Sequence, residues 1–236
     1  MPKPVEAAPK SKSGSQARNT RLDREAAEAR LVTAAIALLA DKGPTELRVR
    51  SVADAAGMST IAVYHHLGGL PDLVNAVVER GFQDLGDAFR ETPATNDPVT
   101  DLFAMALASR RFAQANPHLY DLMFGLSTRG GYRPADSASK VRADSFQVAY
   151  ALLMTACHRL VSSGRVRADQ DAEAVAPQLW SAVHGFITLE LGNHFAHFRD
   201  PVRQVLQPTM VNIAIGLGDD PTLALASHTA AMRASR

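Results

Sequence analysis

The sequence predicts an all-α protein, and three observations support this fold class. Apolar residues recur at the three-to-four-residue spacing of one buried helix face from about Asp23 to about Leu217. The patterns stop at glycine or proline, as at Gly43-Pro44 and Asn116-Pro117, where helices commonly end. No stretch alternates apolar and polar residues as a half-buried strand would, and the sequence has no internal repeat or glycine-rich nucleotide loop. We therefore expect a small three-helix domain followed by a larger helical domain.

Length and composition limit the class of protein. The chain has 236 residues, 46% of them hydrophobic, which is enough for one large or two small domains with packed cores. A formal net charge of +1 creates no global field that would mark a nucleic-acid binder. Cys157 is the single cysteine, so we expect a small core residue and no intrachain disulfide. Because no run approaches the ~20 apolar residues of a membrane span, and the N-terminus lacks an apolar signal region, we expect a cytoplasmic protein.

The first 21 residues form a separate segment without helical periodicity. We expect a disordered arm, because the segment is rich in proline, lysine, serine and alanine. Basic residues outnumber Glu6, the one acid before Leu22, and a block of this kind either lies near nucleic acid or acts only as a solubilising tail. The basic residues are Lys3, Lys10, Lys12, Arg18 and Arg21.

Residues 22–70 have the spacing of a helix-turn-helix domain. A first helix begins near Asp23 and ends at Gly43-Pro44. The apolar positions Val49, Val52, Ala53 and Ala56 then predict a short second helix. Gly57 allows a sharp turn through positive φ, and Ser59 is a suitable N-cap for a third helix. Two short helices joined by a glycine-centred turn are typical of a helix-turn-helix.

The third helix sorts its residues into two faces. Val63 and Leu67 should pack inward, whereas Ile61, Tyr64 and His65 share the opposite face. In a major groove, an exposed Ile61 would contact a thymine methyl group; the alternative is that it leans back on its own domain. Tyr64 would donate to a phosphate, which sets register but reads no sequence. His65 and the adjacent His66 would donate to phosphate or guanine, and adjacent positions on a helix do not make a metal site.

The rest of the chain predicts further helices. A long apolar stripe over 71–90 indicates a bridging helix, and the composition of 91–98 (ETPATNDP) indicates a linker. We expect helices near 98–116, 118–124, 136–163, 171–198 and 200–217, a loop at 125–135 and a flexible tail at 221–236. Residues 91–220 would thus form the second domain.

These residues resemble the tetracycline-repressor (TetR) family of bacterial regulators. The resemblance covers Asp23 to Phe82 and rests on the first helix, the AGMS turn, the sequence Tyr64-His65-His66-Leu67 and the bridging helix from Pro71. It implies a third helix in the major groove. In the second half, Trp180-Ser-Ala-Val-His184-Gly185 followed by FITLEL resembles a C-terminal class marked by Trp, His and Gly. This class implies a small-molecule pocket and two long helices that pair with a partner subunit.

One position departs from the family pattern. Family members often carry lysine or arginine shortly before the bridging helix, where it meets a phosphate, and this chain has Leu70 there. We hypothesise that Arg48, Arg50 or the basic arm supplies the missing phosphate contact.

The resulting function is a non-enzymatic transcriptional regulator, expected to be a repressor. It would bind a palindromic operator in double-stranded DNA as a homodimer, so that the two-fold symmetry of the dimer sets the spacing of the two half-sites. It would leave DNA when a small-molecule effector binds. No cofactor is expected. The predicted DNA contacts are Arg48, Arg50, Ser59, Thr60, Ile61, Ala62, Tyr64, His65 and His66. The predicted dimer contacts are Gly185, Gly192, Ala196, Ile213 and Leu217, each of which has core packing as its alternative.

The predicted effector pocket combines apolar walls with polar anchors. The principal candidates are Phe103, Arg110, Met123, Phe146, Trp180 and His184. Further wall candidates are Met105, Leu107 and Phe186, and further anchor candidates are His118, Tyr120 and Asn193. For His184 the alternative is a hydrogen bond that holds two helices in register.

Three rival functions remain open. Glu190, His194 and His197 at helical spacing would make a metal-responsive regulator of the same fold, although the H-E-x-x-H of zinc proteases is absent. A helical interaction protein that does not bind DNA would leave Ile61 and Tyr64 unexplained. The S-x-x-K sequence Ser137 to Lys140 occurs in serine enzymes, but neither S-D-N nor K-T-G accompanies it.

Overall fold

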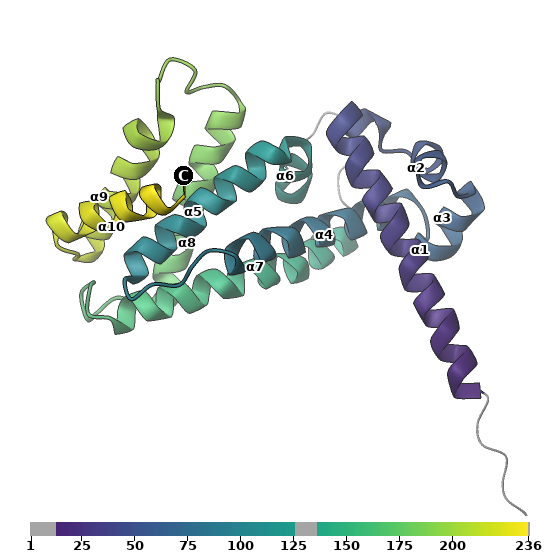
Figure 1. Cartoon of the computed structure of the whole chain (residues 1–236), viewed down its shortest axis with the longest axis horizontal. Coiled ribbons are helices and arrows are strands. Elements are labelled where there is room, and N and C mark those ends of the chain that lie inside the picture. Colours follow the sequence, from purple (N-terminus) through teal and green to yellow (C-terminus); the bar gives the residue numbers. More distant parts are fainter. Residues whose placement is uncertain (1–12, 126–135, 236) are drawn as a thin grey trace, which may run out of the picture. The chain divides into compact units, whose positions relative to one another are not determined.

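A computed structural model describes residues 13–125 and 136–235, with side chains from 21 to 125 and from 144 to 235. These residues form ten α-helices, one 3-10 turn and one π-helical turn, without a strand (Figure 1). Within the same ranges, every helix is too short or too polar to cross a lipid bilayer. The predicted all-α fold is therefore confirmed.

The chain divides after Val74 into two compact units, which we call unit 1 and unit 2. Unit 1 contains α1 (Ser13–Lys42), the 3-10 turn η1 (Pro44–Glu46), α2 (Val49–Ala56) and α3 (Thr60–Leu67). The first turn of α4 (Leu70–Arg90) belongs to unit 1 and the rest of α4 belongs to unit 2. α1 packs against both α2 and α3, so the short helices share one core.

The turn between α2 and α3 has the geometry that its sequence predicts. Gly57 caps α2 in the left-handed region, at φ 62°, where a side chain would be strained. Ser59 has extended backbone, and its hydroxyl accepts a hydrogen bond from the amide of Ala62 at 3.2 Å. Val52 and Val63 are completely buried beneath the turn. The predicted helix-turn-helix is present.

Unit 2 is built around α5 (Pro98–Ala115). α6 (Pro117–Phe124), α7 (Asp136–Ser162), α8 (Ala172–Leu191) and α10 (Pro221–Ala234) all pack against it. The π-helical turn η2 (Val202–Leu206) leads into α9 (Gln207–Leu217), which packs on α8 and α10. From Val99 to Ser109, every residue of α5 except Thr100 is buried, as expected for a helix enclosed on all sides. Cys157 on α7 is a buried free thiol whose pKa burial raises to about 12, in agreement with the predicted core role.

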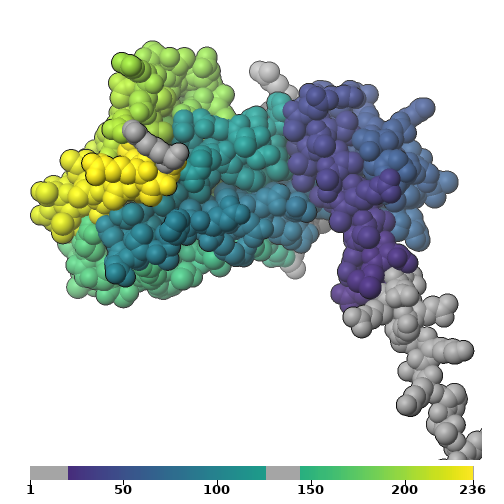
Figure 2. Space-filling view, viewed as in Figure 1, coloured from purple at the N-terminus to yellow at the C-terminus, as the bar shows by residue number. Residues whose placement is uncertain are grey.

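The prediction of a flexible tail at 221–236 is wrong. Residues 221–234 form α10, which packs against α5 and lies on the face of unit 2 shown in the space-filling view (Figure 2). Asp220 caps the helix by accepting hydrogen bonds from the amides of Thr222 and Leu223, and Pro221 occupies the first turn. Aspartate followed by proline is a helix-start signal in its own right. On the inner face of α10, His228 is buried with its ring centroid 4.6 Å from that of Phe103.

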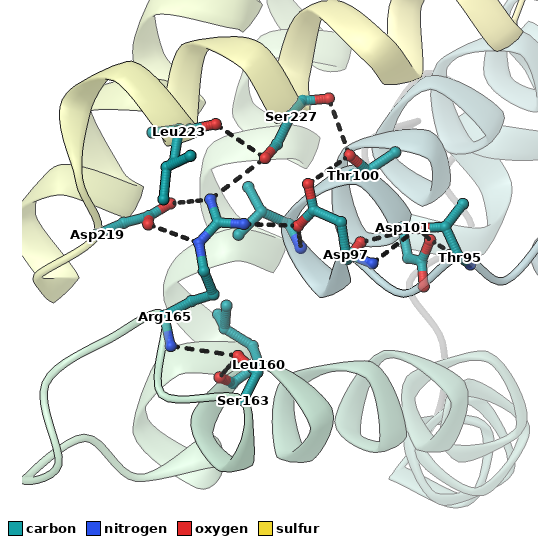
Figure 3. Close-up of polar contacts among 12 residues, drawn as sticks. Thr95, Asp97, Thr100, Asp101, Leu160, Ser163, Arg165, Asp219, Leu223 and Ser227 are labelled. Carbon is teal, nitrogen blue, oxygen red and sulfur yellow. Dashed lines mark hydrogen bonds and ion pairs between the residues drawn. The ribbon is translucent and has the colours of Figure 1, made fainter.

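A buried ion-pair network fastens α10 to the rest of unit 2 (Figure 3). Arg165, in the connection after α7, donates to both oxygens of Asp219 at 2.8 Å and to Asp97 at 2.8 Å. It also donates to the hydroxyl of Ser227 at 3.2 Å. Burial alone would raise the pKa of Asp97, but hydrogen bonding with Ser227 and Thr100 and the charge of Arg165 lower it overall. One arginine thus joins the start of α5, the start of α10 and the loop after α7.

Three other boundaries differ from the sequence prediction or lie outside the structure. α1 begins at Ser13 rather than near Asp23, and residues 1–12 of the predicted arm lie outside the described residues. The predicted loop at 125–135 also lies outside them, apart from Gly125, which caps α6. α8 ends at Leu191 instead of near Phe198, because Asn193 adopts a positive φ of 62° that breaks the helix.

Candidate DNA-binding surface and ligand site

The outward face of α3 carries two large exposed side chains. Ile61 is 77% exposed and Tyr64 is 59% exposed, and His65 and Thr60 are exposed beside them. Val63 is completely buried and Leu67 is half-buried, so the predicted division of this helix into two faces is confirmed. Ile61 does not lean back on its own domain. An exposed face of this composition can offer apolar contacts and hydrogen bonds to a partner.

Two of the predicted contacts turn partly away from that face. Ala62 and His66 are half-buried, and the Nδ1 atom of His66 is buried without a hydrogen-bond partner in the described part of the chain. The backbone carbonyl of His66 accepts a hydrogen bond from the Arg24 guanidinium at 3.5 Å. His66 therefore lies partly on the inner side of α3, whereas His65 is exposed and available to a partner.

Basic side chains flank the outward face of α3. Arg50 on α2 is exposed and has no hydrogen bond or ion pair within the described ranges. Arg48 is exposed at the N-cap of α2, and its Nε atom donates to the carbonyl of Thr45 at 3.0 Å. The sequence analysis overlooked Arg30 on α1, whose guanidinium lies 2.9 Å from the position of a β-carbon built on Gly57. Its helical position on α1 gave no sign that it reaches the turn.

Unit 2 contains a cluster of aromatic rings from four helices. The Trp180 and His184 rings on α8 have centroids 4.0 Å apart, and the Phe124 ring of α6 lies 4.4 Å from that of His184. Phe82 of α4 lies 5.6 Å from Phe124 and 5.9 Å from Phe146. The ring cluster consists of Phe82, Tyr120, Phe124, Phe146, Tyr150, Trp180 and His184.

His184 is the polar centre of the ring cluster. Its Nδ1 atom is hydrogen-bonded to the hydroxyl of Tyr120, and its Nε2 atom is buried without a partner in the described part of unit 2. Burial lowers the pKa of His184 to about 3, so the imidazole is neutral at physiological pH. Burial likewise raises the pKa of Tyr120, which keeps its hydroxyl protonated. An unsatisfied buried nitrogen is uncommon and calls for an explanation.

A small apolar cavity lies next to Trp180. Its walls come from α4, α5, α7, α8 and α9 and include Phe89, Met105, Leu153 and Val183. The space open to the centre of a water molecule is about 20 Å³, which is room for roughly one water. A drug-sized ligand needs several hundred Å³, so it would have to move the surrounding side chains.

Comparison with known proteins identifies the family. The family model described as "Bacterial regulatory proteins, tetR family" matches residues 31–77, and the model described as "Tetracyclin repressor-like, C-terminal domain" matches residues 102–212. The chain belongs to the TetR family. It is a transcriptional regulator with a DNA-binding helix-turn-helix, as the sequence predicted, and nothing in the comparisons points to an enzyme.

Relatives of this TetR-family chain extend over both units. It is 27% identical over 172 residues to HTH-type transcriptional regulator Rv1816 of Mycobacterium tuberculosis (strain ATCC 25618 / H37Rv), covering 72% of this chain and 70% of that protein. A protein of unknown function from Rhodococcus sp. RHA1 superposes with a TM-score of 0.67 at 24% identity, covering 82% and 96% of the two chains. RolR, solved in complex with resorcinol, superposes with a TM-score of 0.64 at 16% identity, covering 88% and 95%.

The predicted ligand residues fall into different places in this TetR-family fold. Phe146, Trp180 and His184 meet in the ring cluster, and Met105 lines the cavity beside it. Met123 instead packs on α4, where a methyl group on Gly81 would lie 2.6 Å from its sulfur. Arg110 is not a free anchor, because it forms two 2.8 Å hydrogen bonds with Glu190.

Other candidates for the pocket lie elsewhere. Phe103 is buried against α10, and Phe186 stacks on Phe195 with centroids 5.3 Å apart. His118 and Asn193 are exposed. The sequence analysis missed Phe82, Phe124 and Tyr150 of the ring cluster. The pairs Phe146–Tyr150 and Trp180–His184, each four residues apart on one helix, were a usable signal for two neighbouring ring faces.

The predicted dimer residues are unequally placed. On α8 Gly185 is exposed, and a β-carbon built on it would meet no atom within 4 Å. Gly192 and Ala196 are exposed at and beyond the end of α8, and Ile213 is half-buried. Leu217 is a correction, because it is buried within unit 2 and lines a small interior space with Val99 and Leu160.

Of the two chemical rivals, the metal site falls among described residues and the S-x-x-K site does not. Glu190 is engaged by Arg110, and the early end of α8 separates it from the helical register of His194 and His197. Among the described residues, no three His, Cys, Asp or Glu side chains are grouped to hold a metal ion. The S-x-x-K sequence lies in the first turns of α7, where the side chains are outside the described residues.

Proposed function

We propose that this TetR-family regulator is a cytoplasmic repressor that binds a palindromic operator as a homodimer and is released by a small molecule. The outward face of α3 carries the proposal. Ile61 and Tyr64 are large, exposed and contribute nothing to the core of unit 1. Apolar and aromatic side chains exposed together in this way are usually covered by a partner.

The chemistry of that face suits the major groove. Ile61 offers methyl groups to a thymine methyl, Tyr64 offers a hydroxyl to a phosphate, and His65 offers a donor to guanine. Arg50 and Arg30 have no hydrogen bond or ion pair within the described ranges of unit 1, so they are free to meet phosphates. The guanidinium of Arg48 already donates to the carbonyl of Thr45. Arg48 is therefore the weaker candidate for the phosphate contact that a basic residue at position 70 would make.

A homodimer through α8 and α9 would supply the second half-site. On α8, Gly185 and Leu189 are exposed, and on α9, Ile215 and Gly216 are exposed. Small residues let helices approach closely, while the two large apolar side chains provide area to bury. Gly185→Arg should shift the sedimentation of the protein towards the monomer, whereas Thr155→Arg on the exposed face of α7 should not. Equal behaviour of the two variants would place the subunit interface elsewhere.

α4 is the element through which a ligand would act. It begins in unit 1 at Leu70, and its residue Phe82 packs on Phe124 and Phe146 of the ring cluster. A ligand among the rings would therefore press directly on α4. RolR, which shares the fold, is described with an aromatic ligand, resorcinol. A coupling of about 1–3 kcal/mol would weaken operator binding about 5–150-fold.

Selection of bound sequences from a random DNA pool tests the proposal. A palindromic consensus with half-sites about one helical turn apart is the expected result. Binding to sheared genomic DNA should also weaken steeply as salt increases. A well-folded protein that enriches no sequence and binds DNA independently of salt would instead be a helical interaction protein.

A further inference from the structure

The ring cluster contains one hydrogen-bonding atom whose role can be worked out from its neighbours. The hydroxyl of Tyr120 and the Nδ1 atom of His184 are partners, and neither has a second partner in the described part of unit 2. If Tyr120 donates, Nδ1 accepts, the ring proton sits on Nε2, and one donor is left unpaired. If Nδ1 carried the proton, both the tyrosine hydrogen and the Nε2 lone pair would be unpaired. The first arrangement leaves fewer buried groups unsatisfied and is therefore favoured.

Among the described residues, the ring contacts of His184 are aromatic and uncharged, and Asp121, which follows Tyr120 on α6, is an acidic group whose charge acts on Tyr120. The ring contacts are Tyr120, Phe124 and Trp180, and Phe146 and Tyr150 lie behind Trp180. Arg110 of α5 and Glu190 near the end of α8 form an ion pair and neutralise each other. Burial lowers the pKa of His184 to about 3, so the ring itself brings no positive charge at neutral pH. A ligand cation would find no counter-ion among these contacts, whereas a flat uncharged molecule would find ring faces.

We propose that His184 is the polar anchor of the effector, and that its Nε2–H group donates one hydrogen bond to an acceptor atom of a compact, uncharged aromatic ligand. The proposal deepens the function proposed above, because it names the chemical class of the small molecule and the atom that recognises it. Tyr120 acts as a positioning residue, since its hydroxyl holds Nδ1 in the accepting state and so fixes the proton on Nε2.

The same geometry explains how a ligand would be sensed. Nε2 is sealed from solvent, so an acceptor reaches it only when side chains around it move. The rings of Phe124 and Trp180 lie against His184, and we expect these two to part. Phe124 is in contact with Phe82 of α4, with centroids 5.6 Å apart, so its displacement is passed to α4. A ligand that satisfies Nε2 offsets the cost of parting the rings, whereas one without an acceptor does not.

Trp180 is the only tryptophan in the chain, so its fluorescence reports on the site directly. We suggest titrating the full-length protein with three probes of matched skeleton: acetophenone, cumene and 1-phenylethylammonium. Acetophenone presents a carbonyl acceptor, cumene has no polar atom, and the ammonium ion presents donors only. For a fragment of this size, the expected dissociation constant of acetophenone is about 1 mM. We expect acetophenone to bind about tenfold more tightly than cumene and the cation to bind weakest.

Two variants assign the preference to the proposed atoms. His184→Phe keeps a ring and removes the donor, so acetophenone and cumene should then bind equally. Tyr120→Phe removes the group that fixes the tautomer, so the preference should shrink severalfold while Trp180 remains reporting. Thermal unfolding establishes that each variant is folded. Nitrogen-15 spectra of the histidine rings provide a readout without ligand: the His184 signals should indicate a proton on Nε2 and should change in Tyr120→Phe.

Several outcomes would overturn the proposal. These are equal binding of acetophenone and cumene to the unmodified protein, tightest binding of the cation, a proton on Nδ1, or no acetophenone binding at several times the expected constant. A gel-shift titration with acetophenone separates this inference from the proposed function. Binding with the expected preference but without DNA release would contradict ligand-controlled repression and leave the role of His184 intact.

Discussion

The outward surface of unit 1 and the interior of unit 2 treat their polar side chains in opposite ways. On unit 1, Tyr64, His65 and Arg50 are exposed and have no hydrogen-bonding or ionic partner within the described residues. In the interior of unit 2, by contrast, long polar side chains are paired across helices, as in Arg110–Glu190 and Arg165–Asp219. The unpaired groups are therefore informative in each unit. In unit 1 they form the surface that we propose contacts DNA, and in the described part of unit 2 the one buried side-chain nitrogen without a partner is Nε2 of His184.

Breaking a paired group in unit 2 should have the largest effect, and the effect should be on stability. Arg165→Met leaves the carboxylate of Asp219, whose side chain is 1% exposed, without its partner. We expect a loss of about 3 kcal/mol in the free energy of unfolding, measured by urea denaturation. Arg203→Met removes an exposed pair with Asp200 and is the matched control, with an expected loss below about 1 kcal/mol. Equal losses would mean that the Arg165 network is not what holds α10.

Removing an unpaired group from unit 1 should impair binding and leave stability unchanged. If Tyr64 makes the proposed phosphate contact in each subunit of a dimer, Tyr64→Ala removes two contacts worth about 1 kcal/mol each, so operator affinity should fall about 30-fold. Trp180→Ala in the ring cluster should change DNA affinity much less. Gel-shift titration of both variants, after melting curves that establish folding, measures the difference. Matched losses in two folded proteins would contradict the division between a reading unit and a sensing unit.

The burial of His184 in unit 2 should lower the free energy of unfolding at acidic pH. The folded-state pKa of His184 is about 3, whereas an unfolded histidine titrates near 6.5. Below pH 6.5 the unfolded chain therefore binds a proton that the folded chain does not, so stability decreases as the pH falls. This one residue should cost about 2 kcal/mol between pH 7 and pH 5. Urea denaturation at both pH values should show a correspondingly smaller loss for His184→Phe, and an unchanged loss would contradict the burial argument.

The smallest effect should distinguish the two arginines of α2. Arg50 has no partner in unit 1, so Arg50→Ala should reduce the salt dependence of operator binding by about 0.9 per subunit, or about 1.8 for a dimer. Arg48 already donates to Thr45, so Arg48→Ala should change the slope less. The measurement is the logarithm of the binding constant against the logarithm of salt concentration. If neither variant alters the slope, the basic arm becomes the remaining source of the missing phosphate contact.

Local patterns predicted the fold and the exposed face of α3 well, because their causes lie close together in sequence. The Ser59 cap, the Gly57 turn and the two faces of α3 all depend on residues within a few positions. The ring cluster was predicted only in part, since Phe82, Tyr120 and Phe146 come from three different helices. Arg165 could not be assigned at all, because its partners Asp97 and Asp219 lie 68 and 54 residues away.

The misassigned tail shows a different limit. Residues 221–236 are rich in alanine and weakly amphipathic, so their apolar pattern was too faint to indicate a buried face. The helix-start signal Asp220-Pro221 was present in the sequence. Its significance became clear only from the packing of α10 on the apolar face of α5. The role of a helix that buries another helix can be recognised only from their tertiary packing.

The position of α10 also has a consequence for the order in which this protein is made. Unit 1 is complete once residue 74 has left the ribosome, and it can fold while synthesis continues. α5 is produced soon afterwards, but its outer face and the carboxylate of Asp97 wait for α10, which follows every other described helix in the sequence. Until α10 is made, unit 1 of the nascent chain is complete but unit 2 is not. A premature stop near Pro221 would leave α5 uncovered, and we expect cellular proteases to remove such a product.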